Sequence, residues 1–204
     1  MESNLNNLNL ITDRLEIRNL QMHDLADFYA YRSNPEVTKY QGFDVYTLEQ
    51  AQSFIEENTT KVLSVPGQWV QYAIANRNTG KLIGDCAIKL DQNDTRLGEI
   101  GITISPCEQK KGYAKEALIN ILHFLFNLEG FHRITETVDA ENIASIQLLK
   151  SVGFRQEGHF IENIFFKGKW RGLLQPKTGW CGMPLPLLFP ITRRKVLLYL
   201  RDSC

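Results

Sequence analysis

Three strand-like segments, separated only by short turns, lead directly into an amphipathic helix. Residues 69–77, 81–90 and 96–105 are rich in β-branched and apolar residues, and the intervening "NTG" and "QNDT" are typical of turns. Beyond Gly112, apolar residues recur at the i, i+3, i+4 and i+7 spacing of a helix that packs one face on a sheet. They are Ala114, Ala117, Leu118, Ile121, Leu122 and Leu125. The sequence therefore predicts an antiparallel meander with a helix packed against it.

The other segments extend this pattern on both sides. Thr47 with Gln50 three residues later forms a capping-box pattern, while Asn142 and Gly153 are placed to begin and end a helix. Asp24 is a further cap candidate. The elements predicted are a strand at 14–20, helices at 24–35 and 47–64, a strand at 133–138, a helix at 142–153 and one or two strands at 154–166.

Charge and composition narrow the possible functions. The 204 residues carry 23 basic and 23 acidic side chains, so a bulk attraction to nucleic acid or an anionic membrane is not expected. No window approaches the roughly 18 apolar residues of a membrane span, and no signal peptide is indicated. The four cysteines show no paired spacing, so neither a disulfide framework nor a metal site is predicted, and we expect a cytoplasmic protein.

A candidate anion site lies at residues 108–117, "EQKKGYAKEA". The first turn of a helix has free backbone N–H groups and the positive end of the helix dipole. Gly112 removes a side chain where a ligand would approach, and Lys110 and Lys111 add positive charge. These features indicate a phosphate cradle. The alternative is that the glycine only shapes a turn and the lysines are solvated.

The same segment carries a family resemblance. Residues 109–114, "QKKGYA", match the Q/R-x-x-G-x-G/A signature of the GNAT (Gcn5-related) N-acetyltransferases, and residues 139–154 resemble that family's D-x-x-N…K-x-G-F segment. Residues 12–24 and 97–106 resemble in particular its RimJ/RimL-type branch. The resemblance extends over residues 10–170, which we take as one domain.

This resemblance implies a fold and an activity. The fold is mixed α/β, with a twisted, mostly antiparallel sheet that is flanked by helices and splayed between its fourth and fifth strands. The activity is direct transfer of acetyl from acetyl-CoA to a primary amine in a ternary complex. A protein or peptide N-terminus is the first expectation, with a polyamine, an amino sugar or a non-catalytic acyl-CoA-binding module as alternatives. Monomer and homodimer both remain open.

By resemblance, backbone groups of the loop hold the pyrophosphate and the fourth strand holds the pantetheine arm. The alternatives are plain strand core for residues 102–104 and a helix cap for Asn142. The residues assigned to the cofactor are Ile102, Thr103, Ile104, Gln109, Lys110, Lys111, Gly112, Tyr113, Ala114, Lys115 and Asn142.

Two residues are candidates for proton transfer. Glu99, in the fourth strand, is the only carboxylate that the sequence places at the slot, and we expect it to be the general base; the alternative is a structural carboxylate. Ser145 matches a hydroxyl of the RimJ/RimL branch and could address the sulfur of CoA, or simply occupy the first helical turn. Leu149 stands where many family members have a tyrosine acid.

The acceptor is less constrained. Tyr40, Phe43 and Trp69 could line its pocket, although core packing is the first expectation for each. At pH 7 roughly one in ten α-amino groups is neutral, whereas fewer than about one in a thousand lysine side chains is. A weak base therefore favours an α-amine.

The resemblance ends at residues 165–170, "FFKGKW". Residues 171–204 are proline-rich, lack a clear period and form a predicted atypical tail. A frameshift in the gene is one explanation. The other is a genuine extension in which residues 196–200 replace the last strand of the sheet.

Overall fold

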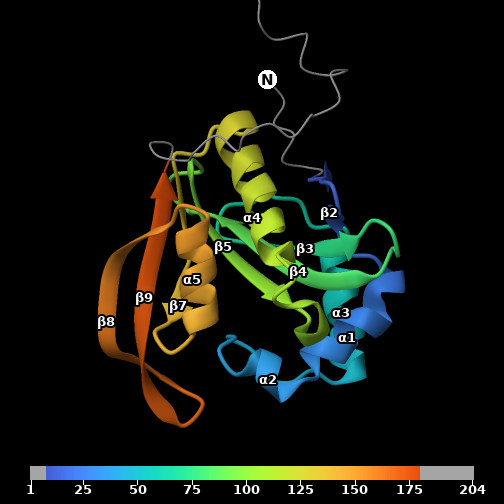
Figure 1. The fold of residues 1–204 in the computed structure, drawn as a ribbon, viewed down its shortest axis with the longest axis horizontal. Coiled ribbons are helices and arrows are strands. Elements are labelled where there is room, and N and C mark those ends of the chain that lie inside the picture. Colours follow the sequence, from blue (N-terminus) through green and yellow to red (C-terminus); the bar gives the residue numbers. More distant parts are fainter. Residues whose placement is uncertain (1–7, 180–204) are drawn as a thin grey trace, which may run out of the picture.

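The computed structural model describes residues 8–179 of the chain. Its centre is one mixed sheet, in the order β1-β2-β3-β4-β5-β6-β9-β7, with β8 paired to β9 (Figure 1). The strands are β1 (Leu10–Ile11), β2 (Leu15–Asn19), β3 (Trp69–Asn76), β4 (Leu82–Leu90), β5 (Leu97–Ile104), β6 (Arg133–Thr135), β7 (Val138–Asp139), β8 (Arg155–Phe166) and β9 (Lys169–Gly179).

The sheet is antiparallel from β1 to β5, as the meander predicted, and then divides. β5 and β6 run parallel and pair through only three positions, of which Glu99 opposite Thr135 is the last. Within the described chain, residues 100–104 pair with β4 on one side and with no strand on the other. This opening is the splay that was predicted between the fourth and fifth strands of the sequence, which correspond to β5 and β6. It leaves backbone groups of β5 unpaired along an internal edge of the sheet.

Helices cover both faces of the sheet. α4 (Tyr113–His123) and α5 (Ile143–Ser151) lie on the near face in Figure 1, α1 (Leu25–Arg32) and α3 (Leu48–Thr59) lie toward the lower right, and α2 (Pro35–Thr38) lies at the bottom. The alternation of β3 separates two cores. Tyr72 and Ile74 belong to the larger core with α4, whereas Ala73 belongs to the smaller core with α1 and α3.

Most local signals in the sequence are confirmed. The Thr47 hydroxyl accepts from the Gln50 N–H at 3.2 Å and the Gln50 side chain accepts from the Thr47 N–H at 2.8 Å, so the capping box is complete. Gly153 ends α5 with φ of 93°. Asp24 is a correction, because its buried carboxylate makes no capping bond to α1 and instead accepts two hydrogen bonds from Arg18, at 2.8 and 2.9 Å.

The strand predicted at 133–138 is interrupted. β6 ends at Thr135, and the backbone N–H of Glu136 turns to the carbonyl of Pro176 at 3.1 Å before β7 begins at Val138. The interruption allows the chain to leave β5 and to continue along β9. It lies directly beside the splay.

β8 and β9 form a hairpin that closes this half of the sheet. The two turn residues, Lys167 and Gly168, have φ of 47° and 81°, as a tight primed turn requires. β9 continues to Gly179 and pairs with β6 and β7, so the domain boundary predicted at residue 170 falls inside a strand. Residues 180–204, including the strand predicted at 196–200, lie outside the described residues. No helix among the described residues is both long and apolar enough to cross a membrane.

Candidate active site

The loop between β5 and α4 has the geometry of an anion cradle. Gly112 has φ of 84° and ψ of 0°, a left-handed conformation that favours glycine, and Lys110 is also left-handed with φ of 61°. No atom of the described chain accepts a hydrogen bond from the backbone N–H groups of residues 110–115. A row of free donors at the positive end of an 11-residue helix fits a diphosphate.

Side-chain contacts hold this loop in place. The Gln109 side-chain amide donates to the Ile104 carbonyl at 3.0 Å. Arg14 donates to the Lys111 carbonyl at 3.1 Å, forms an ion pair with Glu116 at 2.7 Å, and lies 4.4 Å from the Tyr113 ring centre. The Gln109 and Tyr113 side chains thus hold the loop, and only their backbones face a ligand.

The lysines of the loop differ in their partners. Lys111 forms an ion pair with Glu108 at 3.0 Å, so part of its charge is compensated. Lys110 and Lys115 are exposed and have no carboxylate partner within residues 8–179. These two are therefore the cations most available to a phosphate.

The predicted slot lies along β5. Thr103 and Ile104 are buried and Ile102 is half-buried, so their side chains serve the strand core as the alternative interpretation held. Their backbone is nevertheless on the part of β5 that has no partner in β6. Core side chains and ligand-facing backbone are compatible here.

Glu99 lies where β5 and β6 part. Its carboxylate forms an ion pair with Lys89 of β4 at 2.7 Å, and the Lys89 ammonium lies 4.5 Å from the ring centre of Trp69. Glu99 is half-buried and is directed to the α1/α3 face, because its cross-strand neighbour is Lys89 while Ile88 and Ile100 face the larger core.

Glu136, a second carboxylate, directly follows Thr135, which makes the last residue pair with β5 opposite Glu99. Glu136 is only 7% exposed, and its Oε2 has no hydrogen-bond partner. Burial and the negative charge of Glu99 raise the pKa of Glu136 to about 8. The sequence contained a signal, since period-two alternation in "RITETV" places Glu136 on the inward side with Ile134 and Val138.

Cys86 and Tyr72 are buried on the neighbouring strands β4 and β3. Cys86 is the cross-strand partner of both Ile102 and Tyr72, and it is fully buried. Burial, Asp85 and Glu136 together raise the pKa of its thiol, so it is an inert group. The Tyr72 hydroxyl is buried and has no partner among the described residues.

The start of α5 presents the other predicted residues. Asn142 caps the helix, since its side chain accepts from the Ser145 N–H at 3.2 Å. Ser145 is half-buried in the first turn. Leu149 is buried in the larger core and offers no proton.

The three candidate acceptor aromatics are not core residues, so the first expectation for them is wrong. Trp69 is 39% exposed, and Tyr40 and Phe43 are half-buried. Phe43 stacks on Arg32 at 4.2 Å, and Arg32 is held by Asp85 at 2.6 Å. Trp69 lies beside Lys89, the ion-pair partner of Glu99, and Tyr40 lies 5.7 Å from Arg171.

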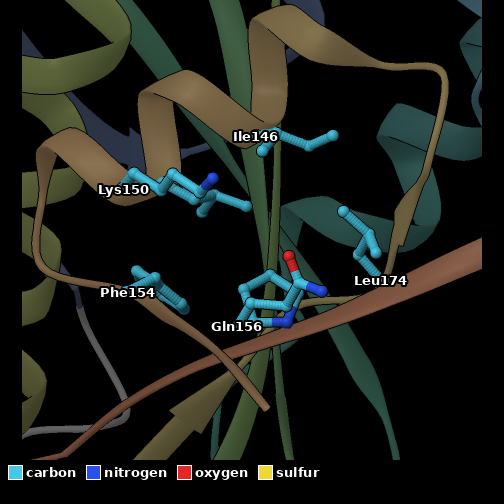
Figure 2. A pocket seen from close by; sticks show the side chains of 7 residues that line it. Ile146, Lys150, Phe154, Gln156 and Leu174 are labelled. Carbon is cyan, nitrogen blue, oxygen red and sulfur yellow. The ribbon is translucent and has the colours of Figure 1, made fainter. Parts of the chain in front are cut away.

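The detected cavities lie elsewhere. Figure 2 shows an apolar pocket between α5 and the β8–β9 hairpin, with a cavity volume of about 10 Å³, which is at the limit for one water molecule. Its labelled residues are Ile146, Lys150, Phe154, Gln156 and Leu174. A wider depression lies over α3 beside Glu49 and Glu57. Neither includes a residue of the loop or of β5.

Comparison with known proteins identifies the family. A family model described as an acetyltransferase (GNAT) domain matches residues 14–155. The chain belongs to the GNAT acetyltransferase family. Uncharacterized N-acetyltransferase p20 of Bacillus licheniformis is 33% identical over 150 residues, which cover 73% of this chain and 83% of p20.

Solved GNAT structures share the fold. An acetyltransferase (GNAT family) from Bacillus anthracis superposes with a TM-score of 0.77 and 25% identity, covering 84% of this chain and 98% of that one. Spermidine N-acetyltransferase from Vibrio cholerae, in complex with CoA and spermine, superposes with a TM-score of 0.70 and 21% identity, covering 82% and 96%. The predicted mixed α/β GNAT fold is confirmed.

Membership defines the class of chemistry. The chain is an acyl-CoA-dependent N-acetyltransferase, and acetyl-CoA is its acetyl donor. The free amides of the β5–α4 loop fit the diphosphate of this donor, and the unpaired edge of β5 fits an extended arm. The identity of the acceptor amine is a separate question.

Proposed function

We propose that this GNAT enzyme acetylates the α-amine of a protein or peptide N-terminus, by direct attack of the amine on the thioester in a ternary complex. The observation that carries the choice of acceptor is the charge balance beside the slot. Apart from Glu136, whose raised pKa of about 8 keeps it protonated near pH 7, each carboxylate described there has a cationic partner within 3 Å. The pairs are Glu99–Lys89 at 2.7 Å, Asp85–Arg32 at 2.6 Å, Asp139–Arg171 at 2.7 Å and Glu141–Lys169 at 2.9 Å.

A polyamine carries several positive charges and needs carboxylates that are not already compensated. A peptide N-terminus brings one charge, followed by a backbone that hydrogen bonds can recognise. Its amine also reaches the neutral, nucleophilic form near pH 7 far more easily than a lysine-like amine does. Both arguments favour the α-amine.

The proposal gives each residue of the site a role. The amides of residues 110–115 bind the diphosphate, with Lys110 and Lys115 as cations. The backbone at Ile102, Thr103 and Ile104 holds the arm of the donor and polarises the thioester carbonyl. Glu99, which is paired with Lys89, removes the proton from the attacking amine, directly or through water. Asn142 positions the start of α5, where Ser145 faces the sulfur.

A small amine is the second candidate, because a solved neighbour is a spermidine N-acetyltransferase with spermine bound. Assignment to the RimJ/RimL branch is part of the first proposal and stands or falls with it.

Thiol release from acetyl-CoA tests the choice. The acceptors are a peptide with a free N-terminus and one lysine, the same peptide with its N-terminus blocked, spermidine and an amino sugar. We expect turnover with the free N-terminus and not with the blocked peptide. Higher kcat/KM for spermidine than for the free peptide would overturn the acceptor assignment. Thermal stabilisation by acetyl-CoA without thiol release from any amine would instead indicate a non-catalytic binding module.

A further inference from the structure

Glu136 occupies the gap between the two parts of the sheet. Its neighbour Thr135 makes the last pair with β5, opposite Glu99, and the Glu136 N–H already points away to Pro176 of β9. The side chain interacts electrostatically with Glu99 of β5 and with Cys86 of β4. Cys86 pairs with Ile102 of β5, which lies beyond the last β5–β6 pair, so the carboxyl group lies near the point where β5 and β6 part.

One oxygen of the Glu136 carboxyl group has no hydrogen-bond partner in the described chain. Glu136 is more than nine-tenths buried, and its Oε2 has no hydrogen-bond partner. A buried oxygen without a partner costs free energy, so its retention in a native site requires an explanation. Beyond the Glu99–Thr135 pair, residues 100–104 of β5 have no strand partner on this side within the described chain, and the donor's arm is proposed to lie there.

The two carboxylates of the slot have opposite environments. Glu99 is half-buried and has the Lys89 ammonium at 2.7 Å. Glu136 is buried, and the groups that interact with it electrostatically are the Glu99 carboxylate and the buried Cys86 thiol, neither of which is a cation. Burial and the negative charge of Glu99 raise the pKa of Glu136 to about 8, so it carries a proton at pH 7. A carboxylate beside a cation and a buried carboxyl group that keeps its proton are suited to be one base and one acid.

We propose that Glu136 is the general acid of the acetyl transfer and protonates the sulfur of the departing coenzyme A. This inference rests on the proposed function, with Glu99 as base. As the amine nitrogen forms its bond to the acetyl carbon and loses a proton to Glu99, the carbon–sulfur bond breaks and its electron pair takes the proton of Glu136. One proton leaves nitrogen and one reaches sulfur, so the reaction balances, and solvent exchange restores both carboxyl groups.

The role of Ser145 changes accordingly. A serine hydroxyl can donate a hydrogen bond to sulfur, but it is too weak an acid to surrender its proton near pH 7. Ser145 is therefore a positioning residue in this scheme.

Glu136→Gln keeps the size and hydrogen-bonding capacity of the side chain and removes the transferable proton. We expect kcat to fall by about 10²-fold or more, which is the usual contribution of a general acid, with acetyl-CoA still stabilising the protein against heat. The wild-type kcat should decline as pH rises through about 8, and that decline should be absent in the variant. Glu157→Gln, an exposed carboxylate of β8 paired with Lys177, is the matched control and should retain both features.

Infrared difference spectroscopy provides a test that needs no acceptor. Wild type at pH 7 should show the carbonyl band of a protonated carboxylic acid, which shifts when coenzyme A binds and is lost at alkaline pH. A wild-type kcat and alkaline decline in Glu136→Gln, or a band unchanged by coenzyme A, would overturn the proposal. An enzyme inactive with every amine, but with a band that shifts, would overturn the proposed function and leave the contact with sulfur supported.

Discussion

The side-chain amide of Gln109 donates a hydrogen bond to the backbone carbonyl of Ile104, at 3.0 Å. This bond joins the anion loop to the end of β5 and so fixes the distance between the diphosphate cradle and the slot. Gln109→Ala removes one hydrogen bond, worth about 1 kcal/mol, from this brace. We expect the Kd for acetyl-CoA, measured by calorimetry, to rise about fivefold with kcat little changed. Gln52→Ala breaks a bond to Glu56 on the surface of α3 and should leave the Kd unchanged.

Alanine substitutions at Gly112 and at Gly80 distinguish the effect of backbone strain from the effect on ligand binding. Both have positive φ, 84° and 70°, and alanine at either position should cost about 1 kcal/mol of stability. A Cβ at Gly112 would lie at the cradle, 3.4 Å from Arg14, whereas one at Gly80 meets nothing within 4 Å. Only Gly112→Ala should weaken acetyl-CoA binding, by tenfold or more in a titration. Equal Kd values for the two variants would show that the loop does not hold the donor.

Glu99→Gln tests the base. The variant keeps the shape of the side chain and cannot accept the amine proton, so kcat should fall by about 10²- to 10⁴-fold while the Kd for acetyl-CoA stays the same. Steady-state kinetics and calorimetry separate the two quantities. A variant with normal kcat would reduce Glu99 to a structural partner of Lys89.

The raised pKa of Glu136 leads to a prediction about stability that is independent of activity. Its pKa is raised in the folded state to about 8, above the ordinary glutamate value near 4.5. Between these values the unfolded chain releases the proton and the folded chain keeps it, so the free energy of unfolding should decrease as pH rises. The expected slope is about 1.4 kcal/mol per pH unit.

Urea denaturation at several pH values between 5 and 9 measures this slope. In Glu136→Gln the contribution should be absent, and the variant should be more stable than wild type at pH 8. Parallel stability curves for the two proteins would show that Glu136 is ionised in the folded state.

Asp85 anchors α1 to the sheet. It accepts hydrogen bonds from Arg32 at 2.6 Å and from Tyr31 at 2.5 Å, and all three groups are buried. Asp85→Ala leaves the Arg32 charge buried without its partner, so thermal or urea denaturation should show a loss of about 3 to 5 kcal/mol. Asp94→Ala, which removes an exposed pair with Arg96, should change stability little. A small loss at Asp85 would mean that water reaches Arg32.

Local features were predictable from sequence because they depend on neighbouring residues. The capping box at Thr47, the cap at Asn142 and the glycine at the start of α4 each require only a few consecutive residues. The pairing of Glu99 with Lys89 was not predictable in this way. It depends on the register of β4 against β5, which is set by the whole sheet.

Two failures have a common physical origin. Glu136 was overlooked because a strand was assumed to continue through it, whereas the backbone leaves β5 at that residue. β9 was overlooked because its buried positions hold Arg171, Pro176 and Thr178 beside Leu174, which do not give an apolar alternation. Arg171 is accommodated there by Asp139 at 2.7 Å, a contact between residues far apart in sequence.

The division of the sheet also has a mechanical consequence. β1–β5 and β6–β9 are joined along their common border by only three residue pairs. The extended arm of the donor, lying beside residues 100–104, would take the place of a missing strand and connect the two parts of the sheet. Binding of acetyl-CoA should therefore make the whole enzyme more rigid. The amine would then enter a rigid site only after acetyl-CoA has bound.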